Sequence, residues 1–130
     1  MNLNESFKTR AEITLTDLME TIHAACKQAG WYTDLETGEP LDRNVGEMMA
    51  LVHSEISEAL EGYRKNLMDD HLPQRRMVEV ELADAMIRIL DLAAYLDCDI
   101  GGALIDKFEY NQTRADHQIE NRRKPDGKKI

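Results

Sequence analysis

Apolar and polar residues repeat along the chain with the period of an α-helix in four segments, and strand-like alternation is rare. The first predicted helix runs from about Leu15 to Ala29, and Gly30 provides a left-handed stop. Its start is open by two residues, because Asp17 and Glu20 also have the spacing of a capping box. Residues 30–42 then predict a loop, since glycine, proline, aspartate and threonine cluster there.

The second predicted helix begins at Asn44, which has the residue type of an N-cap and is followed by Glu47 three positions later. An apolar stripe follows along one side of this helix: Val45, Met48, Met49, Val52, Ile56, Ala59, Leu60 and Tyr63. Three glutamates accompany it and are not equivalent. Glu55 lies at the edge of the stripe, Glu58 lies farther round, and Glu61 lies opposite, where we expect it to be solvated.

The third predicted helix starts with Pro73 in its first turn and ends near Leu96 or Asp97. Apolar residues cover more than half of its circumference, which predicts burial on more than one side. The polar residues that remain form a narrow strip: Glu81, Asp84, Arg88, Asp91 and Tyr95. Of these, Asp91 is predicted either to reach toward a site at the strip or to pair with Arg88.

The fourth predicted helix begins after Asp99 as its N-cap and continues to about Glu120. One side can face a core, and a second side carries polar residues at helical spacing: Lys107, Asn111, Arg114 and Gln118. These patterns predict an all-α protein with an architecture like a four-helix bundle. We expect a single domain over residues 1–121 and a disordered basic tail over residues 122–130.

The net charge is −9. This charge argues against a nucleic-acid duplex as a partner, because the acidic body of the chain would repel its phosphates. No apolar run has the length of a membrane span, and the polar N-terminal segment does not have the pattern of a secretory signal. We therefore expect a cytoplasmic protein that binds neither a duplex nor a membrane. Cys26 and Cys98 share no motif and are interpreted as two buried, reduced thiols.

Two acidic pairs stand out as candidate chemistry: Glu55-x-x-Glu58 on the second helix and Glu81-x-x-Asp84 on the third. A short turn makes these helices antiparallel neighbours, so the four carboxylates can converge. Two unit charges about 4 Å apart repel by about 4 kcal/mol at an effective dielectric of 20, which favours binding of a cation. Oxygen ligands suit Mg²⁺, with Mn²⁺ as a possible substitute. The alternative is an ordinary solvated acidic face.

A di-iron centre is a weaker alternative, since it calls for two Glu-x-x-His pairs. The sequence offers one such pair, Glu20 with His23.

The segments "SEISEALE", "EVELADAMIRILDLAAYL" and "KFEYNQTR" resemble the MazG-like all-α nucleoside triphosphate pyrophosphohydrolases. This superfamily also includes dimeric dUTPases, dCTP pyrophosphatases and phosphoribosyl-ATP pyrophosphatase, and the resemblance covers about residues 13–117. It implies hydrolysis of an NTP or dNTP between the α and β phosphates, giving a monophosphate and pyrophosphate.

The resemblance also implies roles for individual residues. The carboxylates that would bind Mg²⁺ and carry the chemistry are Glu55, Glu58, Glu81 and Asp84. Lys107 and Arg114 would contact phosphates, and Asn111 would help to hold the nucleotide. Trp31 would stack near the base. The alternatives remain open: the three polar residues can form an exposed helix face, and Trp31 can be a hydrophobic plug.

Two further expectations concern specificity and assembly. Arg88 stands where some pyrimidine-specific relatives carry an aromatic residue, which argues against a dCTP-type pocket. The broad apolar surface of the third helix predicts a homodimer or a dimer of dimers. The competing class of function is a non-catalytic helical module that binds a nucleotide or a protein and merely retains the acidic residues.

Overall fold

Short polar side chains begin three helices of the protein, whose residues 1–130 are all described by a computed structural model. Asn4 Oδ1 accepts a hydrogen bond from the amide of Phe7 at 2.8 Å. Asn44 Oδ1 accepts from the amide of Glu47 at 3.1 Å, and Asp99 Oδ1 accepts from Gly102 at 2.9 Å. The caps predicted at Asn44 and Asp99 are therefore confirmed.

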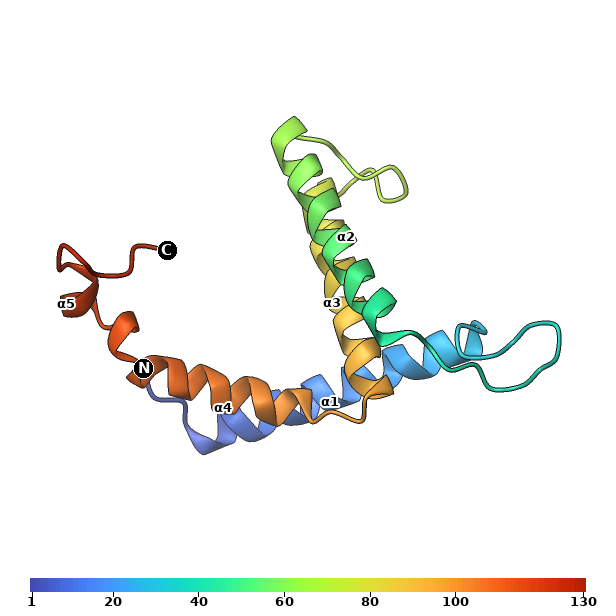
Figure 1. Cartoon of the computed structure of the whole chain (residues 1–130), viewed down its shortest axis with the longest axis horizontal. Coiled ribbons are helices and arrows are strands. Elements are labelled where there is room, and N and C mark those ends of the chain that lie inside the picture. Colours follow the sequence, from blue (N-terminus) through green and yellow to red (C-terminus); the bar gives the residue numbers. More distant parts are fainter. The chain divides into compact units, whose positions relative to one another are not determined.

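The secondary structure consists of helices, joined by loops that hold two isolated β-bridges (Figure 1). The all-α prediction is confirmed, whereas the bundle architecture stays a prediction. None of the helices combines the length and the apolar character that crossing a membrane requires. The elements are α1 (Glu5–Gln28), α2 (Val45–Lys65), α3 (Met77–Tyr95), α4 (Ile100–Thr113), a 3₁₀ turn (Ala115–His117) and α5 (Ile119–Arg122).

The first predicted boundary is wrong, because α1 starts at Glu5 and not near Leu15. The side chain of Asn4 caps this earlier start, so Asp17 lies inside the helix and caps nothing. Residues 5–14 are mostly polar and carry only a weak apolar pattern, so periodicity does not reveal this first part of the helix.

The start of α3 is also later than predicted, at Met77 instead of Pro73. The buried carboxylate of Asp69 accepts hydrogen bonds from the amides of His71 and Leu72, each at 3.4 Å, and this contact shapes a turn. Pro73 belongs to that turn, in which its fixed φ angle is equally suitable.

The end of α4 comes at Thr113, well before Glu120. Arg114 leaves the helix with an extended backbone (ψ 133°), and its guanidinium forms two hydrogen bonds with Asp116, at 2.9 and 2.7 Å. The predicted polar stripe is consequently broken. Lys107 and Asn111 lie on α4, whereas Arg114 and Gln118 do not.

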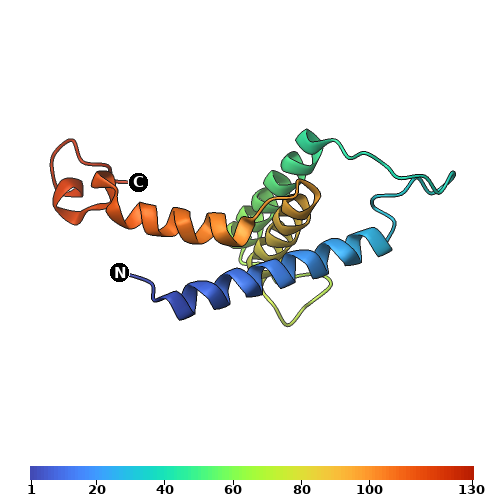
Figure 2. The same ribbon diagram turned by 90° about the horizontal axis from the view of Figure 1, so that it is seen from below.

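The chain separates into two compact units, which are described one at a time. The hairpin unit comprises residues 18–98 and contains α2 and α3 side by side and antiparallel (Figures 1 and 2). Small buried residues, Ala59 and Gly62 on α2 and Ala85 on α3, allow the two helices to approach closely. A Cβ atom added at Gly62 would lie 2.7 Å from Met77 Cγ, so the contact requires glycine.

The core of the hairpin unit lies at the end where α2 begins and α3 ends. Tyr32 from the loop, Met48 from α2 and Leu92 from α3 form its buried centre. Half-buried residues pack around them: Cys26, Val45 and Tyr95. The prediction that both cysteines are buried is wrong, because Cys26 is only half-buried and Cys98, beyond the end of α3, is exposed. This core attaches the 30–42 loop to the helical hairpin.

The terminal unit comprises residues 1–17 and 99–130. Its part of α1 packs against α4, with Lys8 Nζ 2.7 Å from Glu109 Oε1 and Gly101 close to the backbone of Glu12. Residues 123–130 form turns, in which Lys129 Nζ donates to the backbone carbonyls of Arg122 and Lys124. The predicted disorder of this tail is not confirmed, and the single-domain boundary stays a prediction.

The surface of the hairpin exposes many large apolar side chains. Met49, Ile56, Leu60 and Tyr63 share one side of α2, next to the buried side of the helix. On α3 the exposed apolar side chains include Leu82, Met86 and Ile89. Within one chain, therefore, α3 is not buried on several sides as its sequence predicts.

Candidate functional site

The position of Glu55 follows from the packing of α2 against α3. Glu55, Ala59 and Gly62 are spaced four and three residues apart, so they share the side of α2 that faces α3. Glu55 is only 7% exposed. A buried carboxylate requires a partner, because burial of an unpaired charge is strongly unfavourable.

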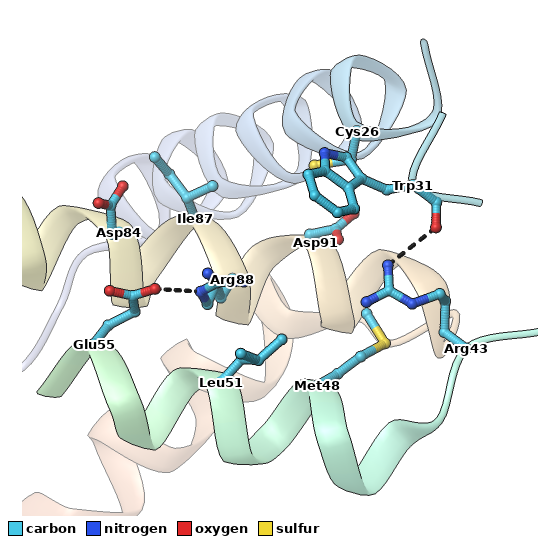
Figure 3. A pocket seen from close by; sticks show the side chains of 10 residues that line it. All are labelled: Cys26, Trp31, Arg43, Met48, Leu51, Glu55, Asp84, Ile87, Arg88 and Asp91. Carbon is cyan, nitrogen blue, oxygen red and sulfur yellow. Dashed lines mark hydrogen bonds and ion pairs between the residues drawn. The ribbon is translucent and has the colours of Figure 1, made fainter. Parts of the chain in front are cut away.

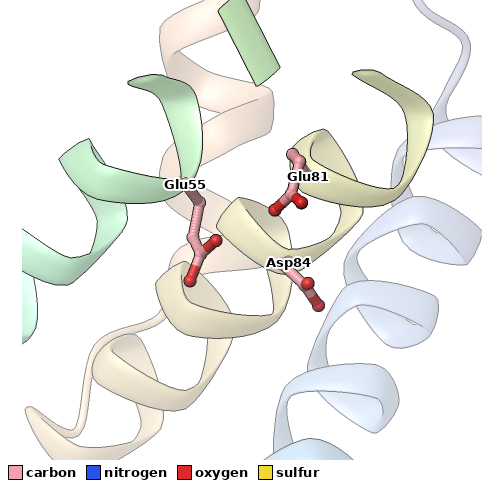
Figure 4. Close-up of side chains that lie close together, drawn as sticks. All are labelled: Glu55, Glu81 and Asp84. Atoms are coloured by element: carbon pink, nitrogen blue, oxygen red, sulfur yellow. The ribbon is translucent and has the colours of Figure 1, made fainter. Parts of the chain in front are cut away.

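Two acidic residues of α3 lie beside it. One carboxylate oxygen from each of Glu55, Glu81 and Asp84 lies within 4.8 Å of the others (Figure 4). We call these three residues the acidic cluster. The structure thus brings together three of the four carboxylates predicted as metal ligands. Glu58 is exposed and is not a member of this group.

Crowding changes the protonation of the acidic cluster. Burial first, then the contact with Glu55 and the charge of Glu58, raise the pKa of Glu81 to about 7. Burial and the charge of Glu55 also raise the pKa of Asp84, while the positive charge of Arg88 opposes that rise. Glu58 therefore contributes to the electrostatics of the site from its exposed position. Like charges held together in this way favour uptake of a proton or a cation.

Arg88 provides the direct counter-charge to the acidic cluster. Its Nε donates to Glu55 Oε1 at 2.5 Å across the two helices (Figure 3). The sequence assigned Arg88 to the same polar strip as Glu81 and Asp84, but it gave no indication of this ion pair. The pair leaves two further carboxylates of the cluster without a cationic partner.

Two members of the acidic cluster, Glu55 and Asp84, border a cavity of about 490 Å³ within the hairpin unit, a volume typical of small-molecule sites (Figure 3). Acidic and basic side chains lie at its wall together with apolar ones. The lining residues are Cys26, Trp31, Arg43, Met48, Leu51, Glu55, Asp84, Ile87, Arg88 and Asp91.

Asp91 is the centre of a second polar arrangement at the cavity wall. Tyr32 Oη donates to Asp91 Oδ2 at 2.8 Å, and His23 Nδ1 is hydrogen-bonded to Asp91 Oδ1 at 2.8 Å. Burial, followed by the contact with Asp91, raises the pKa of Tyr32, and the same two causes raise the pKa of Cys26. Asp91 thus fixes the aromatic loop and α1 to α3, and the alternative pairing with Arg88 is not formed.

Trp31 lies on that loop, and its side chain lines the cavity. At 62% exposure it does not act as a buried hydrophobic plug within this chain. Arg43 Nη1 donates to the Trp31 carbonyl at 3.0 Å, and the Arg43 amide donates to Tyr95 Oη at 3.0 Å. These bonds hold the tryptophan backbone at the cavity.

The three substrate residues predicted on the fourth helix belong to the terminal unit and do not line the cavity. Lys107 Nζ lies 4.8 Å from the centre of the Tyr110 ring. Arg114 pairs with Asp116, whose pKa it lowers. Asn111 Oδ1 is buried without a hydrogen-bond partner. The proposed contacts of these residues with substrate stay predictions.

Several lining residues were not identified from the sequence. Met48 and Leu51 lie on the predicted second helix, but apolar residues in a stripe look alike whether they border a core or a cavity. Arg43 lies in a loop without periodicity, so no sequence signal distinguishes it. His23 and Tyr32 do not line the cavity themselves, and their contacts with Asp91, sixty-eight positions from His23, leave no periodic signal in the sequence.

The chemistry of the acidic cluster fits a hard divalent cation. The donors are all oxygen atoms, which is the ligand type that Mg²⁺ and Mn²⁺ accept. Opposite ligands of one Mg²⁺ lie about 4.2 Å apart, twice the usual bond length. The observed spread of 4.8 Å requires only small side-chain adjustments to reach this value. Glu55, Glu81 and Asp84 could therefore hold such an ion.

No protein family, curated protein or solved structure was found to match this chain. The functional conclusion consequently rests on the site itself and on the sequence motifs that resemble a known family.

Proposed function

We propose that this protein is a Mg²⁺-dependent nucleoside triphosphate pyrophosphohydrolase, with Mn²⁺ as an alternative ion. The observation that carries the proposal is the convergence of Glu55, Glu81 and Asp84 from two facing helices, with Glu55 and Asp84 also lining a cavity. A cluster of carboxylates beside arginine side chains is suited to a cation that in turn binds phosphates. Cleavage between the α and β phosphates rests on the resemblance to MazG-like enzymes.

The residues at the cavity would have different roles. The acidic cluster holds the ion, which when bound neutralises phosphate charge and activates a water. Glu58 adds negative charge beside Glu81 without joining the cluster. Trp31 offers an exposed ring on which a base can stack, and Met48 and Leu51 give that end of the cavity an apolar wall. Lys107, Asn111 and Arg114 remain proposed substrate contacts.

A nucleotide panel tests this function. The full chain is incubated with NTPs and dNTPs in Mg²⁺, and pyrophosphate and orthophosphate are measured separately. We expect pyrophosphate and a monophosphate from at least one nucleotide, and we expect Glu81→Gln to remove this activity. Release of orthophosphate without pyrophosphate contradicts cleavage between the α and β phosphates.

One observation favours a second function, that of a non-catalytic binding module. Arg88 already neutralises one carboxylate of the acidic cluster, so the pair is a stable arrangement without any metal ion. A module of this kind would bind a nucleotide in the cavity and release no product. Saturable binding with no turnover over the whole panel would support it.

We also propose a homodimer or a dimer of dimers. Met49, Ile56, Leu60 and Tyr63 form a continuous exposed apolar side of α2, a feature that is rare on soluble monomers. Self-association through the hairpin would remove these side chains from water, and it would bury α3 on the additional sides that its sequence predicts.

A further inference from the structure

Arg88 lies between the acidic cluster and the cavity. Its Nε is bound to Glu55 of the acidic cluster, and its side chain, which is 41% exposed, lines the cavity. The other lining arginine, Arg43, is already engaged, because its Nη1 donates to the Trp31 carbonyl and its guanidinium lies 5.6 Å from the centre of the Tyr32 ring. Arg88 is thus the cavity arginine whose contact is directly with a candidate metal ligand.

A divalent cation at the acidic cluster would compete with this guanidinium. Both are positive and both would use the carboxylate of the buried Glu55, so their mutual repulsion disfavours binding of the two together. Asp84 provides a second carboxylate on the side of the incoming ion, and the charge of Arg88 already influences it. Arg88, by contrast, loses little on release, because its long side chain reaches both the cavity and solvent.

We propose that Arg88 is the resident counter-ion of the acidic cluster, and that a divalent cation displaces its guanidinium from Glu55 into the cavity, where it binds a phosphate-bearing ligand. This inference rests on the proposed function and deepens it. It makes binding of the cation and of the anion mutually supportive, since each favours the released arginine. Without the cation, the arginine keeps the buried Glu55 paired.

The first test measures cation binding alone by titrating the full chain with Mn²⁺. Arg88→Met removes the competing charge and retains much of the side-chain volume, so it should bind Mn²⁺ on the order of tenfold more tightly than wild type. Arg88→Lys keeps the charge and should bind close to wild type. The matched control is Arg64→Met, which removes an equal charge from the same hairpin at an exposed pair with Glu61.

The second test follows the guanidinium directly by NMR. The Nε–Hε signal of Arg88 is assigned by its absence from the Arg88→Lys protein. In the wild-type protein it should move on addition of Mg²⁺ toward the position of a freely solvated arginine. An unchanged signal at saturating Mg²⁺ would mean that the cation binds beside the intact ion pair, and it would overturn the proposed displacement.

The third test concerns the anion, with tripolyphosphate in excess Mg²⁺ as the probe and the fluorescence of the single tryptophan, Trp31, as the readout. Arg88→Met should weaken tripolyphosphate binding on the order of tenfold, whereas Arg64→Met should not. Equal affinity of Arg88→Met and wild type would overturn the anion-binding role.

The outcomes separate this inference from the proposed function. If Arg88→Met binds Mn²⁺ no more tightly than wild type while pyrophosphate is still released from nucleotides, the inference alone fails. If Arg88→Met shows the gain in Mn²⁺ affinity but no nucleotide releases pyrophosphate, the proposed hydrolysis fails and the counter-ion role stands.

Discussion

Tyr32 donates a hydrogen bond to Asp91 at 2.8 Å, which joins the loop after α1 to the buried side of α3. Asp91 is only 9% exposed and receives this bond beside the one from His23. The pair therefore connects the position of Trp31, next to Tyr32 in the chain, to the helix that carries Glu81 and Asp84. Loss of the bond should affect both stability and the aromatic end of the cavity.

Tyr32→Phe should lower the free energy of unfolding by about 1–3 kcal/mol, because a buried carboxylate oxygen loses its donor while the ring is retained. Urea denaturation followed by circular dichroism measures the change. Tyr110→Phe is the control, since this tyrosine is exposed and should change stability by less than about 0.5 kcal/mol. Equal effects of the two substitutions would contradict a structural role for the Tyr32 hydroxyl.

Stability of the metal-free protein should fall as the pH rises from about 4.5 to about 7. The pKa of Glu81 is raised from 4.5 in the unfolded chain to about 7 in the fold, so the folded protein binds more protons within this window. The stabilisation is complete below the lower value and is lost as the pH passes the higher one. Denaturation at several pH values in a chelator measures the slope.

Glu81→Gln should reduce this slope, because glutamine does not titrate. Glu61→Gln serves as the control: Lys65 lowers the pKa of Glu61, so any effect of that residue lies below pH 4.5. If Glu81→Gln keeps the wild-type slope between pH 4.5 and 7, Glu81 is not the group responsible.

Divalent cations should stabilise the fold through the acidic cluster. At a Mg²⁺ concentration one hundred times the dissociation constant, a single site adds about 2.7 kcal/mol to the free energy of unfolding. Glu55→Gln, Glu81→Gln and Asp84→Asn should each remove most of this gain in a thermal-shift titration. Glu58→Gln should remove less, since Glu58 is exposed and outside the cluster.

The matched control for the cation effect is Glu61→Gln, a substitution of the same kind on the same helix. Glu61 forms surface pairs with Lys65 and Arg64, so its loss should leave the Mg²⁺ shift intact. A shift that is equally reduced in this variant would indicate general charge screening and not a site.

The oligomeric state should depend on the exposed apolar side of α2. Light scattering after gel filtration should give a wild-type mass of at least about 30 kDa, twice the 14.9 kDa of one chain. Leu60→Glu places a charge within that side and should shift the mass toward the monomer. Leu35→Glu, at a still more exposed leucine of the 30–42 loop, should leave the assembly unchanged. A monomeric wild-type protein would contradict the proposed oligomer.

Local chemistry explains which parts of the fold are predictable from sequence. The starts of α2 and α4 depend on Asn44 and Asp99, whose caps involve residues only three positions away. The start of α1 depends equally on Asn4, but it lies ahead of a segment that gains its packing from α4, through contacts such as Lys8 with Glu109. Such contacts are distant in sequence and leave no periodic signal.

The same distinction applies to the candidate site. The spacing of Glu81 and Asp84 on α3 predicts that they share a face, and the structure confirms it. The exposure of Glu58 and the ion pair of Arg88 depend on how far α2 is rotated against α3. The close approach of Gly62 to Met77 accompanies that rotation, and helical periodicity alone does not reveal it.

The close contact at Gly62 has a consequence for redesign of the chain. An insertion among residues 66–76, which join α2 to α3, need not rotate either helix, provided that it leaves intact the turn that Asp69 forms with the amides of His71 and Leu72. A single residue inserted between Met77 and Glu81 would instead turn the rest of α3 by about 100° relative to the glycine contact. The length of the connector can therefore vary, whereas the rotation of α3 about its axis relative to α2 cannot. Variants with a longer connector should retain cation binding.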